Sequence, residues 1–187
     1  MGQKTSKRKY PWSTVIDGKT YTLRLMTAKD KKAMLDFARR LPEDDLLFLA
    51  IDITEEDAVE NWVENVEKGR LHTILVEADG KLVGHGSLIH EEQVWTRHIG
   101  GMILLLAPET RGKGLGNILA GELFGYAEEL GLRKVMARMA ATQKGAISVF
   151  EKLGFKAEAL LTDCVIDRKD KTHDLIIMSY DVTGFNV

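Results

Sequence analysis

The hydrophobic positions of this 187-residue chain recur at two spacings, and the two spacings alternate along the sequence. From Thr20 to Met26 apolar and polar residues alternate, which predicts a strand. Apolar residues three and four positions apart then predict a helix over residues 30–41. A second helix is expected to start at Thr54, because Thr54 and Asp57 have the spacing of a capping box.

The middle of the chain has the pattern of strands. Residues 71–76 and 81–89 flank the turn sequence Ala-Asp-Gly and predict a hairpin. A further strand is expected from about Val94 to Leu106. Its segment IGGMILLL is apolar enough to be buried on both faces of a sheet.

The last third of the chain alternates helices and strands. We expect helices over 117–130 and 144–153, a strand over 134–139, and a closing hairpin over 158–167 and 172–182. The full order is a strand, two helices, three strands, a helix, a strand, a helix and two strands. This order predicts an α/β domain of the α+β type, built around one mixed sheet that helices flank. Residues 1–14 are expected to form a basic N-terminal tail, and residues 15–187 the single domain.

The composition narrows the classes of function. Hydrophobic residues make up 44% of the chain and charged residues 29%, which is ordinary for a globular domain, and the net charge of -2 favours neither nucleic acid nor a membrane as partner. The single cysteine, Cys164, rules out an internal disulfide and fits a reducing compartment. Because no apolar run reaches the roughly 18 residues of a membrane span, we expect a cytoplasmic protein. The histidines and the cysteine show no metal-ligand spacing, so no metal is expected.

The first six residues, MGQKTS, fit the pattern for N-myristoylation, and Lys4, Lys7, Arg8 and Lys9 form a basic cluster there. A lipid-anchored peripheral protein is therefore one alternative. We favour the simpler interpretation, a solvated and poorly ordered start of the chain.

Candidate chemistry lies at residues 108–118, PETRGKGLGNI. A basic, glycine-rich turn that opens a helix presents backbone N–H groups to phosphate. The nucleotide P-loop needs a lysine followed by Ser or Thr, but Lys113 is followed by a glycine. The dinucleotide fingerprint needs GxGxxG, but this run is GxGxG. The run therefore fits neither pattern. A third pattern, Arg/Gln-x-x-Gly-x-Gly/Ala, is met by Arg111, Gly114 and Gly116.

That third pattern resembles the acyl-CoA-binding motif of the GNAT superfamily of N-acetyltransferases. The block LLLAPETRGKGLGNILAGELFGYAEELGLRKV is similar to the family's strand, pyrophosphate turn and helix, and ATQKGAISVFEKLGF is similar to its next block. The terminal DRKDKTHDLIIMSYDV resembles the final strands of many members. The resemblance extends from about residue 20 to the end. It implies the GNAT fold, with a mixed and mostly antiparallel sheet.

The resemblance also implies acetyl-CoA as cosubstrate and a set of residues that bind it. The turn and the start of the helix would hold the pyrophosphate, the strand before the turn would bind the pantetheine arm through its backbone, and two residues near the next helix would contact the arm or the thioester. These residues are Leu104, Leu105, Leu106, Arg111, Gly112, Lys113, Gly114, Leu115, Gly116, Asn117, Gln143 and Phe150.

The implied reaction is direct attack of an amine on the thioester, which needs a base to deprotonate the amine. Many members place a tyrosine, which protonates the leaving sulfur, where this chain has Phe150, and many place a glutamate where it has Gly100 and Gly101. His98 and His173 are the candidate catalytic residues, since an ordinary histidine pKa suits a base. The pair Glu91–Glu92 is a further candidate.

The sequence thus predicts an N-acetyltransferase that moves an acetyl group from acetyl-CoA to a primary amine of a small molecule or a peptide. Neither nucleic acid nor a membrane is expected as partner, and a homodimer is left open. Two alternatives are an acyltransferase for a longer acyl-CoA and a CoA-binding sensor with little turnover. The sensor is motivated by Phe150 and by the absence of the strand glutamate.

Overall fold

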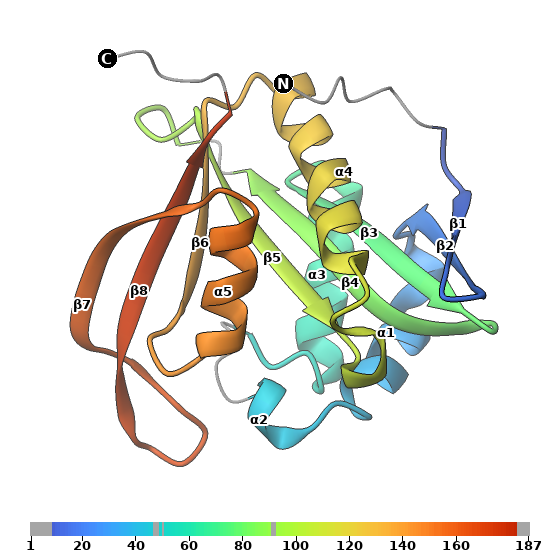
Figure 1. The fold of residues 1–187 in the computed structure, drawn as a ribbon, viewed down its shortest axis with the longest axis horizontal. Helices are drawn as coiled ribbons and strands as arrows, with labels where there is room; N and C mark the ends of the chain where they lie inside the picture. The colour runs from blue at the N-terminus through green and yellow to red at the C-terminus, as the bar shows by residue number, and fades with distance from the viewer. Residues whose placement is uncertain (1–8, 47–48, 50, 91–92, 183–187) are drawn as a thin grey trace.

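The computed structural model describes residues 9–46, 49, 51–90 and 93–182 (Figure 1). Its strands are β1 (Trp12–Ile16), β2 (Lys19–Leu25), β3 (Leu71–Ala78), β4 (Lys81–His90), β5 (Ile99–Leu106), β6 (Lys134–Ala140), β7 (Lys156–Ile166) and β8 (Thr172–Asp181). Its helices are α1 (Lys31–Ala38), α2 (Glu43–Leu46), α3 (Glu56–Glu67), α4 (Leu115–Glu129) and α5 (Lys144–Lys152), with short 3-10 turns η1 (Ala28–Asp30) and η2 (Pro108–Thr110).

All of these strands form one sheet, in the order β1-β2-β3-β4-β5-β6-β8-β7. Neighbouring strands are antiparallel except β5 and β6, which are parallel. Helices α4 and α5 cover one face of the sheet, and α1 and α3 cover the other (Figure 1). This arrangement confirms the predicted fold class, a mixed and mostly antiparallel sheet flanked by helices.

Two elements lie where the sequence analysis expected none. Strand β1 begins at Trp12, inside the expected tail, and pairs with β2 through a turn at Asp17 and Gly18 with φ of 51° and 74°. Two positive φ values in a two-residue hairpin are typical of a type I′ turn. The short helix α2 lies between α1 and α3. Residues 1–8, which carry the myristoylation pattern, lie outside the described residues.

Two predicted element starts were wrong. Strand β5 begins at Ile99 rather than near Val94, because residues 93–98 turn on themselves, with Thr96 N–H donating to the Gln93 carbonyl and Ile99 N–H to that of Thr96. Helix α3 begins at Glu56, and the hydroxyl of Thr54 donates to Asp52 at 2.6 Å instead of capping the helix. Because Glu55 is the N-cap of α3, Thr54 lies one residue too early to form the expected capping box.

Helix α4 lies directly on β4 because Gly86 lies where the helix crosses this strand. A Cβ atom on Gly86 would lie 2.7 Å from Cγ of Leu119 and 3.0 Å from Cδ1 of Leu123, both fully buried in α4. Leu115, in the first turn of α4, is also buried. This close contact fixes the start of α4 beside the end of β5.

The close packing at Gly86 gives a prediction with a matched control on α4. Gly86→Ala should lower the free energy of unfolding by about 1–3 kcal/mol, because the added methyl group overpacks the contact. Gly121→Ala adds the same group on α4 with nothing within 4 Å, and should raise stability by roughly 0.5–1 kcal/mol through helix propensity. Urea unfolding of the two variants checks the pair. Equal stability of Gly86→Ala and the wild type would contradict this account of the packing.

Candidate active site

The two parallel strands at the centre of the sheet separate along their length. Strand β5 pairs with β6 only from Ile99 to Gly101, opposite residues 134–136. Beyond this point β5 continues along β4 as far as Leu106, and β6 continues along β8 as far as Ala140. Among the described residues, the edges of β5 and β6 that face each other past Gly101 pair with no other strand. Backbone N–H and C=O groups are therefore exposed to a molecule that enters between the two strands.

The glycine turn lies at the open end of this gap. Gly112 and Gly114 have φ of 73° and 81°, a region that favours glycine, and Gly114 is the N-cap of α4. Within the described part of the chain, the N–H groups of residues 112–116 donate no hydrogen bond. Consecutive unpaired N–H groups at the positive end of a 15-residue helix form a site for an anion.

Arg111 is fixed at the end of β5. Its Nε and Nη2 donate to the carbonyl of Leu106 at 2.9 and 2.7 Å, and Nη2 also donates to Oδ2 of Asp45 at 2.6 Å. Lys113, two residues further on, is exposed. The turn thus carries positive charge beside its free N–H groups.

The three leucines predicted to contact the pantetheine arm line the end of β5 and are half-buried. Leu104 and Leu106 lie opposite Gly86 and Gly84, on the face that α4 covers, and Leu105 lies opposite His85 on the other face. Cδ1 of Leu106 would lie 3.8 Å from a Cβ atom on Gly116. The structure therefore brings these residues together with the glycine turn.

The other predicted donor contacts lie on or near α5 and α4. Oε1 of Gln143 accepts a hydrogen bond from the N–H of Ala140 at 3.0 Å, which places Gln143 at the end of β6. Asn117 is exposed in the first turn of α4, and its N–H donates to the Gly114 carbonyl. Phe150 is buried and packs edge-to-face on Phe155, with ring centroids 4.9 Å apart.

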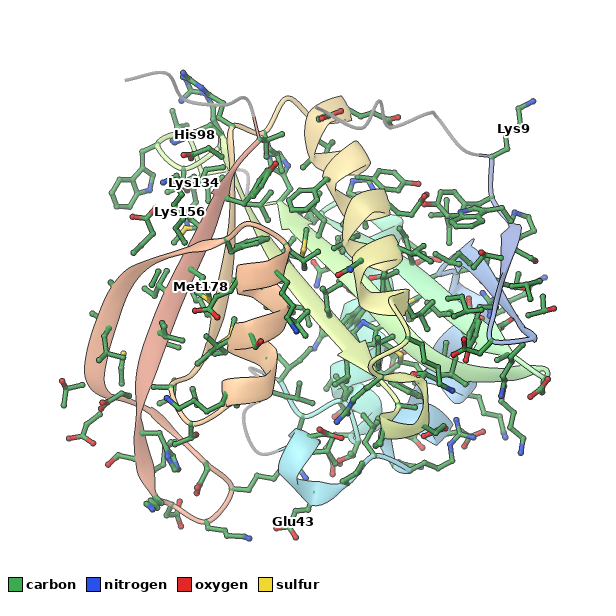
Figure 2. All side chains as sticks on the ribbon, in the orientation of Figure 1. Lys9, Glu43, His98, Lys134, Lys156 and Met178 are labelled. Atoms are coloured by element: carbon green, nitrogen blue, oxygen red, sulfur yellow. The ribbon has the colours of Figure 1, made fainter. Side chains whose placement is uncertain are left out.

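The two candidate histidines lie in different places. His98 precedes β5 at the closed end of the gap, where its carbonyl accepts hydrogen bonds from the N–H groups of Arg133 and Lys134. Figure 2 shows His98 beside Lys134, at the opposite end of the molecule from Glu43 of α2. The eight residues of β5 separate His98 from the glycine turn, roughly 26 Å at about 3.3 Å per residue. The structure does not bring His98 to the turn.

His173 lies at the open end. It stands near the start of β8, next to Asp174, whose carbonyl accepts a hydrogen bond from the N–H of Ala141 just past β6. Nε2 of His173 is 2.7 Å from Oδ2 of Asp167. Glu91 and Glu92, the further candidates, lie outside the described residues.

Asp167 orients the ring of His173. The contact with His173, together with the N–H groups of Lys171 and Lys169, lowers the pKa of the Asp167 carboxyl to about 2. The carboxylate is therefore charged near neutral pH and accepts a hydrogen bond from Nε2–H of His173.

A chain of buried polar side chains joins α3 to β3 and β4, on the face of the sheet that α1 and α3 cover. Trp62 Nε1 donates to the hydroxyl of Thr73 at 2.9 Å, and this hydroxyl is 3.0 Å from that of Ser87. The Ser87 hydroxyl is 3.4 Å from Nδ1 of His85, whose side chain is 1% exposed and packs edge-on against the rings of Phe37 and Trp62. Burial lowers the pKa of His85 to about 4, so the ring is neutral at pH 7.

A model of the acetyltransferase (GNAT) family matches residues 34–155. The chain belongs to this family. The match covers α1 to the end of α5, and therefore includes the glycine turn and both separated strands.

Two curated relatives of this GNAT chain are mycothiol acetyltransferases. The protein of Streptomyces coelicolor is 36% identical over 83 residues, which are 43% of this chain and 26% of the relative. That of Pseudarthrobacter chlorophenolicus is 33% identical over 84 residues, which are 44% of this chain and 26% of the relative. The aligned part thus spans about a quarter of the length of the curated relatives.

Solved GNAT structures share the fold. A putative acetyltransferase from Salmonella typhimurium, solved with its cofactor acetyl-CoA, has a TM-score of 0.76 at 19% identity and covers 89% of this chain and 96% of its own. Spermidine N-acetyltransferase from Vibrio cholerae, in complex with CoA and spermine, has a TM-score of 0.72 at 21% identity and covers 87% and 96%. Identities this low show the common fold alone.

Sequence reasoning missed two features of this GNAT domain. The contact between Asp45 and Arg111 joins residues 66 positions apart, and the chain from Trp62 to His85 joins a helix to two strands. Within the described residues, there is no group of acidic, histidine or cysteine side chains that could hold a metal, and no helix is long and apolar enough to cross a membrane.

The buried histidine gives a prediction about pH. The ordinary pKa of a histidine is 6.5, and that of buried His85 is about 4. As pH falls between these two values, the His85 ring takes up a proton in the unfolded chain but stays neutral in the folded protein. This difference should lower the free energy of unfolding by about 3 kcal/mol over that interval, and His85→Gln should remove the decrease. Urea unfolding between pH 7 and pH 4 checks it. Thr73→Val, which removes no titratable group, serves as control, and a wild-type slope in His85→Gln would refute the assignment.

Proposed function

We propose that the chain is an acetyl-CoA-dependent N-acetyltransferase that acetylates a primary amine of a small molecule or a peptide. The observation that carries the proposal is the set of unpaired N–H groups at residues 112–116, next to the separated strands. A pyrophosphate fits the first feature, and the linear amide-containing arm of coenzyme A fits the second. The family match and the acetyl-CoA and CoA complexes of fold neighbours support the same choice.

The residues of this chain would divide the binding of the donor among them. Backbone N–H groups from Gly112 to Gly116 would hold the pyrophosphate, with positive charge from Arg111 and Lys113. The open edge of β5 at residues 104–106 would pair with the amide groups of the arm. Gln143, Asn117 and Phe150 stay predictions as further contacts. Bound acetyl-CoA would supply an activated acetyl group that an unprotonated amine attacks directly.

The chain would also supply a base and an oxyanion donor. His173, oriented by Asp167, would take up the proton of the acceptor amine. A backbone N–H on the open edge of β5 would donate to the oxygen of the tetrahedral intermediate. His98 is the weaker candidate for the base, because it lies at the closed end of the gap, next to the paired residues of β5 and β6.

One observation favours an alternative function, a CoA-binding module with little turnover. Phe150, at the position where many members have a tyrosine, is packed in the core and has no proton to donate to the sulfur. A thiol with a pKa of about 8.5 is nevertheless a tolerable leaving group near neutral pH. Release of CoA with a broad panel of amines separates the two functions. Transfer of longer acyl groups, a homodimer and a cytoplasmic location stay predictions.

The donor site is tested by a pair of substitutions at the two ends of α4. Gly114→Glu places bulk and negative charge among the free N–H groups and should abolish the binding of CoA, measured by calorimetry. Gly131→Glu makes the same change beyond the other end of the helix. Both glycines have positive φ, 81° and 68°, and a Cβ atom on either meets nothing within 4 Å, so the backbone strain is matched. Equal loss of CoA affinity in both variants, or none in Gly114→Glu, would sink the assignment.

The base is tested by His173→Ala and His98→Ala. Loss of general base catalysis should lower kcat/KM of His173→Ala by roughly 100-fold or more, with the loss reduced at high pH, where more of the amine is unprotonated. His98→Ala should have the smaller effect. A larger loss in His98→Ala would reverse the assignment. Wild-type rates in both variants would instead favour a chain of water molecules as the base.

A further inference from the structure

Asp45, on the short helix α2, contacts the turn of the proposed donor site. Its Oδ2 accepts a hydrogen bond from Nη2 of Arg111 at 2.6 Å, and the side chain of Asp45 is 19% exposed. Among the described residues of α2, Asp45 alone touches the turn through an ion pair. The contact therefore ties the segment between α1 and α3 to the end of β5.

The guanidinium of Arg111 is held by two acceptors at once. The carbonyl oxygen of Leu106 accepts hydrogen bonds from Nε and Nη2, and the carboxylate of Asp45 accepts a second hydrogen bond from Nη2. Within the described part of the chain, Nη1 donates no hydrogen bond. One edge of the guanidinium is thus occupied by the protein, while Nη1 keeps its hydrogen-bonding capacity.

Fixing the arginine in advance favours the binding of an anion. A long side chain that is ordered only when the ligand binds loses roughly 0.5–1.5 kcal/mol of affinity in the process. The carbonyl of Leu106 alone could hold the guanidinium in several orientations about one oxygen. The second acceptor, Asp45, selects among them because its carboxylate makes a charge-assisted bond.

A simple charge argument predicts the opposite effect. The carboxylate of Asp45 adds negative charge near a site for a diphosphate, so its removal should strengthen binding if only the long-range field mattered. The sign of the change on removal of Asp45 therefore distinguishes positioning from repulsion.

Helix α2 supplies a matched control. Glu43, two positions before Asp45, pairs with Lys169 at 3.5 Å, and both of these side chains are 64% exposed. Glu43→Gln and Asp45→Asn each remove one carboxylate from the same four-residue helix. Only the second change removes a contact to Arg111.

We propose that Asp45 is a positioning residue for the acyl donor. It holds Arg111 against the end of β5 so that the free nitrogen of the guanidinium meets the diphosphate. The proposal rests on the proposed function, because it takes a donor with a diphosphate as the ligand of the turn. It adds a residue outside the glycine turn to the donor site, and it connects this site to the helices on the opposite face of the sheet.

The test compares two ligands, CoA and S-acetylpantetheine, which has the arm but lacks the diphosphate. By calorimetry, Asp45→Asn should weaken the binding of CoA by roughly 3- to 10-fold, the range expected for one ordered side chain. The same substitution should leave the binding of S-acetylpantetheine unchanged. Asp45→Glu should restore most of the CoA affinity, and Glu43→Gln should match the wild type. The thermal unfolding midpoint of each variant confirms that the fold is kept.

Three results would overturn the positioning role. These are unchanged or tighter binding of CoA in Asp45→Asn, equal weakening of CoA and S-acetylpantetheine, and equal weakening by Glu43→Gln. Failure of the wild type to bind CoA would overturn the proposed donor itself. The wild-type titration thus separates failure of the proposed function from failure of the inference about Asp45.

Discussion

The arrangement of the site depends on the early separation of β5 and β6. Parallel strands usually bond along their whole length, yet this pair does so only from Ile99 to Gly101. Each strand is held instead by its other neighbour, β5 by β4 and β6 by β8. Past the paired residues, η2 and the glycine turn follow β5, and α5 follows β6. A gap with free backbone groups is therefore built into the sheet without interrupting its outer hydrogen bonds.

The end of β5 is where the constraints of the fold and of the site meet. The carbonyl of Leu106, the last in the strand, accepts hydrogen bonds from the side chain of Arg111. The first residue of the phosphate motif therefore also holds the end of the strand that precedes it. Gly86 lets α4 pack closely on β4, and Gly84 leaves room for the side chain of Leu106 at the end of β5. The same residues that stabilise this corner of the molecule thus orient its charge.

The sequence predicted the elements whose signals are local. The glycine turn, α4, α5 and the hairpin of β3 and β4 follow from spacing and turn residues close together in the chain, and the structure has them within a few residues of their expected bounds. Features that depend on distant partners were missed. Asp45 looks like any acidic residue of a loop until Arg111 is placed beside it, and His85 looks like an alternating strand position until Phe37 and Trp62 cover it. The predicted start of β5 was wrong for a related reason. The apolar residues Val94 and Trp95 fit the pattern of a strand, but they lie in a turn and are 77% and 80% exposed.

The ion pairs of the segment from α2 to α3 suggest how the two sides of the site are coupled. On one side Asp45 reaches Arg111 of the turn, and on the other Asp52 pairs with Arg168 at 2.5 Å in the hairpin between β7 and β8. That hairpin also holds Asp167 and His173, the proposed base. Exposed ion pairs of this kind contribute at most about 1 kcal/mol each and weaken with salt. Asp45 and Asp52 therefore connect the segment between α1 and α3 both to the donor turn and to the hairpin that carries the proposed base.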